Sequence, residues 1–457
     1  MKREYDLIVV GSGIAGQTTA LAAAEAGLDT VIFEKQNAPG GTTVMSGGWF
    51  AFTGTEEMAA ARVEDSREAF LSEMIEVGGG LNDRELLETY LDHQHGTYEW
   101  LKGHGAVFQE LDWGAGLSVR RSHYTPIVEL LDRLRADYLA AGGELHTKSH
   151  VTALLTDGPD HVTGVTVATS NGPVEVISRG GVVLATGGFT RGTDFLRIFA
   201  PKQLQALPFG GRGNTGDGLR MAWALGAGLA DMSFVSGTFG SHPETGDVQE
   251  LLTAFYMGAI VVNQQGRRFI DESVSYKLIG NAVLDQPDGL GFEIFDAKIR
   301  AQSHRGVPVK DIDTLEEKGH VLRATTLEEL AEIAGIDQAG LVATVARYNE
   351  AIASGRPDDV GRNSISSGAG ELVPIDEPPY YAYPAKSLLT STYCGITVTP
   401  EGVVRTIDGR TLDGLYAVGE IVGGFHGAAY ISGTSLGKGA VFGRIVGNRV
   451  SSLLHAR

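Results

Sequence analysis

The stretch "YDLIVVGSGIAGQTTALAAAEAGLDTVIFEK", residues 5–35, organises the chain around it. Residues 5–10 form a short apolar run typical of a strand buried on both faces, and an Ala-rich segment that favours a helix follows. A second apolar run covers residues 29–33. Between the first run and the helix stand three glycines at GxGxxG spacing: Gly11, Gly13 and Gly16. In this strand–helix–strand context the pattern predicts a Rossmann-like, dinucleotide-binding α/β domain.

Each glycine of this motif has a physical task. Gly11 allows the tight turn, Gly13 lets the backbone approach a pyrophosphate, and Gly16 lets helix and strand pack closely. The helix N-terminus then offers free N–H groups and the positive end of its dipole to phosphates. Glu34 stands 18 residues after Gly16, where a carboxylate accepts hydrogen bonds from ribose hydroxyls. The alternative is a glycine-rich turn of an ordinary α/β domain.

Composition limits the classes of function. The chain has 457 residues, which favours two domains. Asp and Glu number 56 and Lys and Arg number 37, so the formal net charge is −19, and we expect no nucleic acid and no membrane as partner. The single cysteine, Cys394, excludes an internal disulfide, a cysteine-ligated iron–sulfur cluster and a c-type haem motif. We predict no metal site.

The beginning of the chain, "MKREYDLIVV", enters the first predicted strand directly. We therefore expect no signal peptide, and no apolar run reaches the length of a membrane span. These features predict a cytoplasmic protein.

A polar, glycine-rich loop follows Glu34 and reads "NAPGGTTVMSGG", residues 37–48. Its backbone N–H groups and hydroxyls could wrap the phosphates and ribityl chain of a cofactor. The alternative is a mobile surface loop. The predicted cofactor contacts in it are Gly41, Thr42, Thr43, Ser46, Gly47 and Gly48.

The rest of the chain suggests a nucleotide-binding domain that is interrupted and then completed. Alternating runs in 144–177 suit a β-meander, and a buried strand, 182–185, leads into Thr186 and Gly187. The pattern then changes to hairpin-like and helical pieces, where Thr326 is an expected helix N-cap. The C-terminal part again reads strand, glycine loop, helix. We predict that residues 1–232 form the first part of the cofactor domain, residues 233–375 a smaller α+β capping domain, and residues 376–457 the C-terminal part of the cofactor domain.

These pieces, in this order, resemble the flavoproteins of the fumarate reductase and succinate dehydrogenase superfamily, and the resemblance covers nearly the whole chain. It rests on the GxGxxG motif with Glu34 and on further motifs: "ATGGF" (185–189), residues 215–218, "GRRFIDES" (266–273), "RYNEAIASG" (347–355), "GLYAVGE" (414–420) and "GTSLGKGAVFGR" (433–444). The resemblance implies an FAD-binding domain of the GR2 type and a substrate-binding cap, with the active site between them.

The resemblance also implies where FAD binds. Glu420 is expected near the ribityl chain, and Ser435 and Leu436 at a helix N-terminus against the pyrimidine edge of the flavin. Further implied contacts are Lys35, Val151, Ala185, Thr186, Gly187 and Asp217. Succinate dehydrogenases attach FAD to a histidine in the loop after the first βαβ unit. The equivalent loop here has no histidine and no cysteine, so we expect non-covalent FAD.

The departures from the dicarboxylate reductases concern the substrate site. Tyr276 and Tyr430 stand where those enzymes carry a proton-donating and a carboxylate-clamping arginine, and Ser391 stands where they carry a clamping histidine. Only His242, followed by proline, resembles the dicarboxylate branch. Two tyrosines at these positions are the pattern of the 3-ketosteroid dehydrogenases of the same superfamily. There, the C-terminal tyrosine and a glycine N–H polarise a ketone, and the cap tyrosine serves as base.

By this resemblance the chain is an FAD-dependent dehydrogenase that forms a carbon–carbon double bond next to the ketone of a cyclic substrate. Tyr430 and the N–H of Gly433 would polarise the ketone, Tyr276 would be the base with Tyr124 as a possible relay, and His242 would contact substrate or relay a proton. The substrate is a 3-ketosteroid or a smaller oxocyclohexane-type ring, and the electron acceptor is external.

Other interpretations stay open. Both tyrosines could be packed residues with satisfied hydroxyls, and His242 a hydrogen-bonded histidine of the cap. The chain could be a reductase of unsaturated acids, or the flavoprotein subunit of an electron-transfer complex. The sequence does not specify direction, ring size, oligomeric state or what would make a tyrosine basic.

Overall fold

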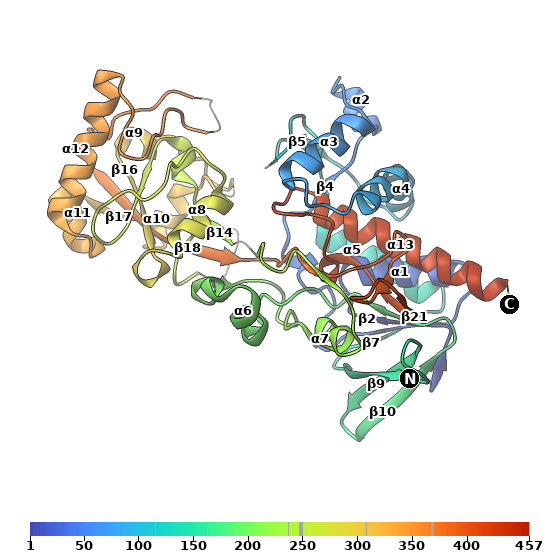
Figure 1. Cartoon of the computed structure of the whole chain (residues 1–457). Helices are drawn as coiled ribbons and strands as arrows, with labels where there is room; N and C mark the ends of the chain where they lie inside the picture. Colours follow the sequence, from blue (N-terminus) through green and yellow to red (C-terminus); the bar gives the residue numbers. More distant parts are fainter. Residues whose placement is uncertain (115, 236, 246–249, 308, 367–369, 457) are drawn as a thin grey trace. The chain divides into compact units, whose positions relative to one another are not determined.

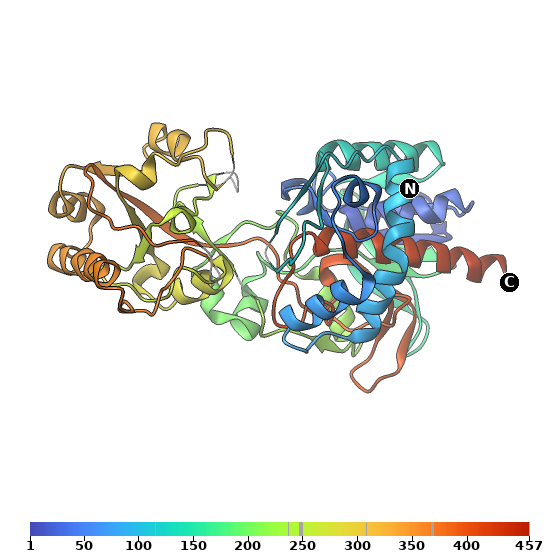
Figure 2. The ribbon, with the colours of Figure 1, turned by 90° about the horizontal axis from the view of Figure 1, so that it is seen from above.

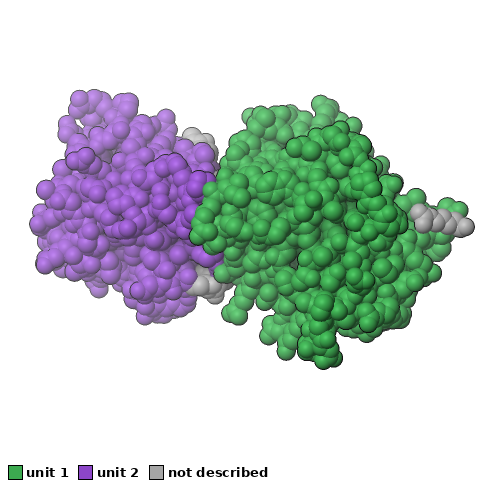
Figure 3. Space-filling view, turned by 60° about the horizontal axis from the view of Figure 1, so that its bottom comes forward, with its two compact units in different colours: residues 1–200, 210–235, 391–457 green, residues 201–209, 236–390 purple. Residues whose placement is uncertain are grey.

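The computed structural model describes residues 1–114, 116–235, 237–245, 250–307, 309–366 and 370–456. These residues form two compact units, which Figure 3 colours separately. Unit 1 holds residues 1–200, 210–235 and 391–457, including both ends of the chain (Figure 2), and unit 2 holds residues 201–209 and 236–390. The domain limits expected from the sequence, 1–232, 233–375 and 376–457, stay a prediction.

The centre of unit 1 is a six-stranded sheet with the order β20–β21–β11–β2–β3–β7. β2 (Leu7–Val10), α1 (Ile14–Glu25) and β3 (Thr30–Phe33) form the predicted strand–helix–strand unit, and both strands are buried throughout. All strands of the sheet are parallel except β20, which pairs antiparallel with β21. The Rossmann-like α/β class is therefore confirmed. The remaining strands are β7 (Glu144–His146), β11 (Val182–Leu184), β20 (Val403–Arg405) and β21 (Thr411–Ala417).

Helix α1 packs closely against the long C-terminal helix α13 (Thr434–His455), and both lie on one face of the sheet (Figure 1). α13 presents a glycine at every fourth position to α1: Gly439, Gly443 and Gly447. A Cβ at Gly443 would lie 2.2 Å from Oγ1 of Thr18, and one at Gly447 would lie 2.5 Å from the carbonyl oxygen of Thr19. Larger residues would push the helices apart, so the glycines hold the C-terminal segment to the first βαβ unit.

The opposite side of the sheet carries a meander, in which β9 contacts β11 and β21 (Figure 1). The sequence predicted it for 144–177, but because residues 144–146 form β7 and pair with β3 in the parallel sheet, the meander begins at His150. Its strands are β8 (His150–Thr156), β9 (Val162–Thr169) and β10 (Gly172–Ser178), with β1 (Glu4–Tyr5) parallel to β10. The other elements of unit 1 are η1 (Thr43–Met45), β4 (Trp49–Ala51), α2 (Glu56–Ala60), α3 (Arg67–Val77), α4 (Arg84–Gly103), β5 (Glu110–Asp112), β6 (Ser122–Tyr124), α5 (Ile127–Ala140), α6 (Thr193–Phe199), α7 (Asp217–Ala224), β13 (Leu229–Ala230), β19 (Gly395–Ile396) and η6 (Gly419–Ile421).

Unit 2 is built on β18 (Tyr380–Leu389), which pairs with β12, β14, β16 and β17. Helix α8 (Tyr276–Val283) packs against β14 and β18. Oγ1 of Thr326 accepts a hydrogen bond from the Glu329 N–H, which confirms the expected N-cap. The other elements are η2 (Pro201–Gln205), β12 (Leu207–Pro208), β14 (Thr238–Ser241), η4 (Ala254–Met257), β15 (Ile260–Val262), η5 (Pro287–Gly289), β16 (Gly291–Phe295), α9 (Ala297–Arg300), α10 (Ile312–Glu317), β17 (Leu322–Ala324), α11 (Leu327–Ala334) and α12 (Gln338–Ser354).

Across the described parts of both units, no helix is both long and apolar enough to cross a membrane.

Candidate functional site

The turn between β2 and α1 has the geometry that its glycines predict. Gly11 has a φ of +105°, and a Cβ there would lie 2.3 Å from the carbonyl oxygen of Ala185. A Cβ at Gly16 would lie 2.0 Å from the oxygen of Gly11, so helix and strand require glycine at both positions. A Cβ at Gly13 would have Oγ1 of Thr43 as its nearest neighbour, at 3.2 Å. The α1 N-terminus therefore has an approachable backbone, as a bound pyrophosphate needs.

Glu34 is buried at the end of β3, beside this turn. Its Oε2 accepts from the Ser12 hydroxyl at 2.6 Å and the Ser12 N–H at 3.2 Å, and its Oε1 accepts from the Gln36 N–H at 2.8 Å. A carboxylate has roughly four acceptor positions, so one remains for a ribose hydroxyl. Glu34 thus orders the turn and keeps capacity for the role expected of it.

The glycine-rich loop after Glu34 is tied to the same turn. Oγ1 of Thr43 accepts from the Ile14 N–H at 3.1 Å, and Oγ1 of Thr42 accepts from the Gly211 N–H at 3.0 Å. The Ser46 hydroxyl donates to the Thr43 carbonyl at 2.8 Å. The remaining glycines of the predicted set, Gly41, Gly47 and Gly48, lie in this loop, and Gly41 and Gly48 have positive φ. The loop is therefore held beside the α1 N-terminus.

Lys35 and Asp217 form an ion pair in unit 1. The Lys35 ammonium lies 2.6 Å from Oδ2 of Asp217 and donates to Oγ1 of Thr215, also at 2.6 Å. His150, next to the expected contact Val151 on β8, lies 3.0 Å from the same carboxylate oxygen. Burial opposes ionisation of Asp217, but its hydrogen bond and charge interaction with Lys35 outweigh burial and lower its pKa. Two of the predicted cofactor residues thus contact each other directly.

Glu420 lies at the start of η6 and binds loops from two other parts of unit 1. Its Oε1 accepts from the Thr392 N–H at 3.0 Å, and its Oε2 accepts from Nδ2 of Asn214 at 2.9 Å. Oε2 of Glu420 would also lie 3.4 Å from a Cβ at Gly187, after β11. Next to Gly187, the buried hydroxyl of Thr186 has no hydrogen-bond partner among the described residues. A polar group of a ligand would satisfy it.

The N-terminus of α13 begins at Gly433, whose φ is +85°. A Cβ there would lie 2.6 Å from the Ala51 nitrogen, so only glycine fits. The amides of Ser435 and Leu436 belong to the first turn of this helix, whose N–H groups have no acceptor within the helix. The expected pyrimidine contact therefore stands at a genuine helix N-terminus.

Tyr430, in the loop before α13, lies in a cluster of rings. Its ring stacks on Tyr393 with centroids 4.6 Å apart and meets His426 edge-on at 5.4 Å. The Gly433 N–H donates to the Tyr430 hydroxyl oxygen at 2.9 Å. The two groups expected to polarise a ketone thus lie together.

The sequence prediction missed Tyr393 as a neighbour of Tyr430. Tyr393 has a φ of +57°, a left-handed conformation that is uncommon for a tyrosine. The nearby imidazole of His426 is buried and its Nε2 has no hydrogen-bond partner among the described residues. Burial and the Lys438 charge lower the pKa of His426 well below its usual range, so it is neutral at physiological pH. The one sequence clue was that Tyr393 follows Ser391, the position of the family's clamping histidine.

Tyr276 lies in unit 2 and is the first residue of α8. Its N–H donates to the Tyr256 hydroxyl at 2.9 Å, and this hydroxyl donates to the Val274 carbonyl at 2.8 Å. The ammonium group of Lys277 lies 5.9 Å from the centroid of the Tyr276 ring. The expected base is therefore fixed by its backbone and has a cation beside it.

His242, also in unit 2, is buried directly after β14. Its Nδ1 accepts from the Glu244 N–H at 3.2 Å, and its ring centroid lies 4.0 Å from that of His320, with the two rings tilted by 31°. Burial and the neighbouring His320 lower the pKa of His242 to about 4. At neutral pH His242 is uncharged and offers a hydrogen bond rather than a positive charge.

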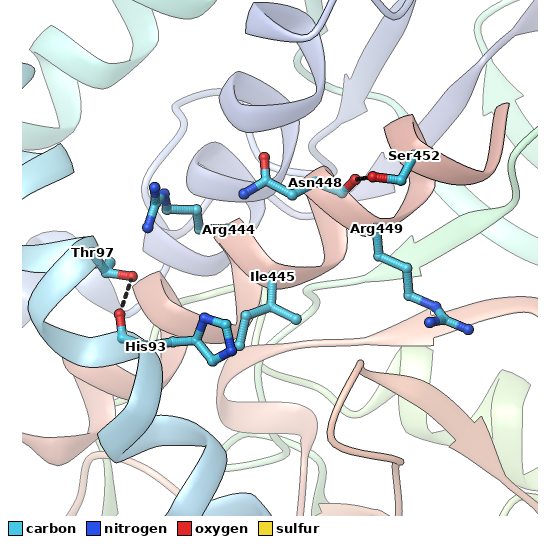
Figure 4. A pocket seen from close by; sticks show the side chains of 7 residues that line it. All are labelled: His93, Thr97, Arg444, Ile445, Asn448, Arg449 and Ser452. Atoms are coloured by element: carbon cyan, nitrogen blue, oxygen red, sulfur yellow. Dashed lines mark hydrogen bonds between the residues drawn. The ribbon is translucent and has the colours of Figure 1, made fainter. Parts of the chain in front are cut away.

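One cavity of about 210 Å³ lies in unit 1 between α4 and α13 and contains none of the predicted site residues. Figure 4 shows the guanidinium groups of Arg444 and Arg449 pointing away from each other. The cavity is lined by His93, Thr97, Arg444, Ile445, Asn448, Arg449 and Ser452. It has no part in the arrangement described above.

The groups of unit 1 fit FAD. Phosphates, ribose and a flavin ring require groups that unit 1 provides: an approachable glycine turn, two helix N-termini, a carboxylate with one remaining acceptor position and a buried hydroxyl without a partner among the described residues. When bound, FAD supplies a two-electron acceptor or donor.

Comparison with known proteins identifies the family. Residues 6–436 match the family described as FAD binding domain. The chain is 29% identical over 453 residues to the Shewanella frigidimarina protein named "Probable fumarate reductase Ifc3", covering 97% of this chain and 74% of that protein. It is 30% identical over 468 residues to a urocanate reductase of Eggerthella lenta, covering 98% of this chain and 75% of that protein.

Solved structures agree with this result. The open conformation of a flavocytochrome c3 fumarate reductase has a TM-score of 0.87 at 27% identity and covers 99% of this chain and 78% of its own. A 3-ketosteroid-Δ4-(5α)-dehydrogenase of Rhodococcus jostii RHA1 has a TM-score of 0.79 at 25% identity, with 98% and 97% covered. The chain belongs to the FAD binding domain family and is an FAD-dependent oxidoreductase acting on CH–CH groups, related to fumarate reductases and ketosteroid dehydrogenases.

Proposed function

We propose that this protein desaturates the carbon pair next to the ketone of a cyclic substrate. The observation that carries the proposal is the contact between the Tyr430 hydroxyl and the Gly433 N–H, 2.9 Å apart at the start of α13. Two hydrogen-bond donors so close together can both reach one ketone oxygen, and such a pair stabilises the negative charge that develops during enolisation. A ketone oxygen would replace the Tyr430 oxygen as the acceptor of the Gly433 N–H.

The remaining steps need a base and a hydride acceptor. Tyr276 takes the proton from the α-carbon, and the electrons of the broken C–H bond form the enolate. The groups of unit 1 described above would hold FAD, which would supply the acceptor for the hydride of the β-carbon and pass its electrons to an outside acceptor. His242 is neutral and can orient the substrate by a hydrogen bond.

A dicarboxylate substrate would need fixed cations, because carboxylates leaving water without partners are costly. Two buried arginines of this chain are already occupied by their own acids. Arg121 contacts Asp65 and Glu73 in unit 1, and Arg268 contacts Glu272 and Asp358 in unit 2. With tyrosines in place of the two family arginines, a neutral ketone is the better-matched substrate.

The relative from Rhodococcus jostii is named for a ketosteroid, which supports a cyclic ketone as the substrate class. Within that class, we favour a smaller ring of the oxocyclohexane type, because the predicted cap has a modest aromatic content.

A second candidate function is reduction of an unsaturated acid. The names of the fumarate and urocanate reductases favour it, and the histidine–proline pair at residues 242–243 is shared with the dicarboxylate branch. It would need another group in this chain to hold the carboxylate.

Anaerobic mixing distinguishes the two functions. We expect cyclic ketones to bleach the flavin absorbance of the oxidised enzyme and succinate to leave it unchanged. We also expect fumarate to leave the chemically reduced enzyme reduced. Rapid reoxidation by fumarate or urocanate, with no response to any cyclic ketone, would establish the reductase instead.

A further inference from the structure

We propose that Lys277 is a positioning residue for the reaction proposed above: its ammonium group holds negative charge on the phenol oxygen of Tyr276 and so makes Tyr276 a proton acceptor. The inference rests on the proposed function, because it explains how a tyrosine could serve as its base. A free tyrosine ionises near pH ~10, so without help almost none is a phenolate at neutral pH.

The first support is the position of the ammonium group. The Lys277 Nζ lies 5.9 Å from the centroid of the Tyr276 ring. It also donates a hydrogen bond to Oγ1 of Thr238 on β14 at 2.7 Å, which holds the long side chain in one place. A positive charge at this distance favours the ionised form of a phenol.

The second support is the rigid backbone of the pair. Oγ of Ser275 accepts from the Lys277 N–H at 3.3 Å and caps α8, while the Tyr276 N–H is bound by the Tyr256 hydroxyl. Both residues therefore stand in the first turn of α8, where the positive end of the helix dipole adds to the charge of the lysine.

The third support is the environment of the lysine. Lys277 is half-buried, and burial lowers the pKa of its ammonium group to about 8. Because the ammonium group lies beside the phenol ring, we expect the two groups to titrate as a pair, so that the first proton leaves the pair rather than one residue. Once the pair has lost this proton, it can accept one from carbon.

Among the described residues, the titratable side chains on the two strands that contact α8, β14 and β18, place no negative charge beside it. Burial raises the pKa of Tyr256, which stays a neutral hydroxyl beside Tyr276, and β14 (Thr238–Ser241) carries no titratable side chain. β18 approaches α8 with Ser387, whose hydroxyl lies beside Gly280, while the preceding residue, Lys386, alternates to the other face. Tyr383, on the Ser387 face, donates to the Glu250 carbonyl and is also neutral because burial raises its pKa.

The test is a direct titration of Tyr276 in the FAD-loaded enzyme. Tyrosinate absorbance in the near ultraviolet is followed against pH, and the curve of a Tyr276→Phe variant is subtracted in the same background. Lys277→Met removes the charge and keeps an apolar stem, and Lys277→Arg keeps a charge at every pH. The subtraction removes the contributions of flavin and of the other tyrosines.

We expect the midpoint of Tyr276 ionisation to rise by about one pH unit or more in Lys277→Met, which corresponds to about tenfold less phenolate at a given pH below it. In Lys277→Arg the midpoint should stay or fall. An unchanged midpoint in Lys277→Met overturns the inference, and so does a midpoint in Lys277→Arg as high as in Lys277→Met. If Lys277→Met does not fold, the midpoint of Tyr276 ionisation in Lys277→Arg is compared with that of the wild type. A higher midpoint in Lys277→Arg then overturns the inference.

Flavin reduction by a cyclic ketone gives a second readout. Lys277→Met should be about tenfold slower near neutral pH and approach wild type at high pH. An equal loss at every pH would mean that Lys277 only supports the structure, and would overturn the inference. If no ketone reduces the enzyme, the proposed function fails, but the titration still decides whether Lys277 controls Tyr276.

Discussion

Tyr430 in unit 1 and Tyr276 in unit 2 are the same side chain in different surroundings. Tyr430 lies among Tyr393 and the neutral His426, and its oxygen accepts from a backbone N–H. Tyr276 stands at a helix N-terminus with an ammonium group beside its ring. A backbone N–H donor and a neutral imidazole suit a hydroxyl that stays protonated and donates, whereas an ammonium group beside the ring favours a phenolate that accepts a proton. One residue type can thus supply both polarities that an enolisation needs, as in enzymes whose paired carboxylates differ in role.

The largest expected effect is at Tyr276. Tyr276→Phe removes the proposed base, so flavin reduction by a cyclic ketone should slow by about 10²-fold or more, while the ketone still binds. Stopped-flow reduction across the pH range measures this. The wild-type rate should rise as pH rises through the titration of the Tyr276–Lys277 pair, and the variant should lose this dependence.

The control for Tyr276 is Tyr348→Phe in the same unit, because the buried Tyr348 hydroxyl has no partner among the described residues. It should react at nearly the wild-type rate. A flat wild-type pH profile together with an active Tyr276→Phe enzyme would remove Tyr276 from the role of base and make His242 the next residue to test.

A somewhat smaller effect is expected at Tyr430. Tyr430→Phe removes one of two donors to the enolate oxygen, which typically costs about 10²- to 10³-fold in turnover. The loss should be the same at all pH values, unlike that of Tyr276→Phe, because Tyr430 acts as a hydrogen-bond donor and not as the base. FAD content and melting temperature should stay close to wild type.

Tyr393→Phe is the matched control for Tyr430, since it keeps the stacked ring and removes only a neighbouring hydroxyl. We expect its rate within a few-fold of wild type. If Tyr430→Phe reacts as fast as Tyr393→Phe, the Tyr430 hydroxyl is only a packed group, and the contrast between the two tyrosines collapses.

The last prediction concerns the attachment of FAD, where we expect no covalent change to the polypeptide. The loop of residues 37–48 has neither histidine nor cysteine, so FAD should be bound without a covalent bond. Acid precipitation should release all the yellow colour, and mass spectrometry of the denatured protein should give the mass of the polypeptide alone. Flavin left on the pellet would place a covalent link elsewhere in unit 1 or unit 2.

Much of the cofactor site could be predicted from the sequence because its geometry is local. The GxGxxG turn must use glycine where a Cβ would meet the Ala185 oxygen. The number of residues between this turn and Glu34 is fixed by α1, the turn after it and β3. The tyrosines in place of family arginines were also readable from the sequence. Their roles remain predictions.

The sequence by itself determined the Rossmann-like class, the FAD family and the residue types at the substrate positions. Tertiary structure alone decided which groups meet across long separations. It stacked Tyr393 on Tyr430, joined Glu420 to Asn214 and Thr392, and placed the Lys277 ammonium against both the Tyr276 ring and Thr238. Local motifs follow from backbone constraints over a few residues. The charge state of a buried side chain depends on every group packed around it, and those groups come from distant parts of the chain.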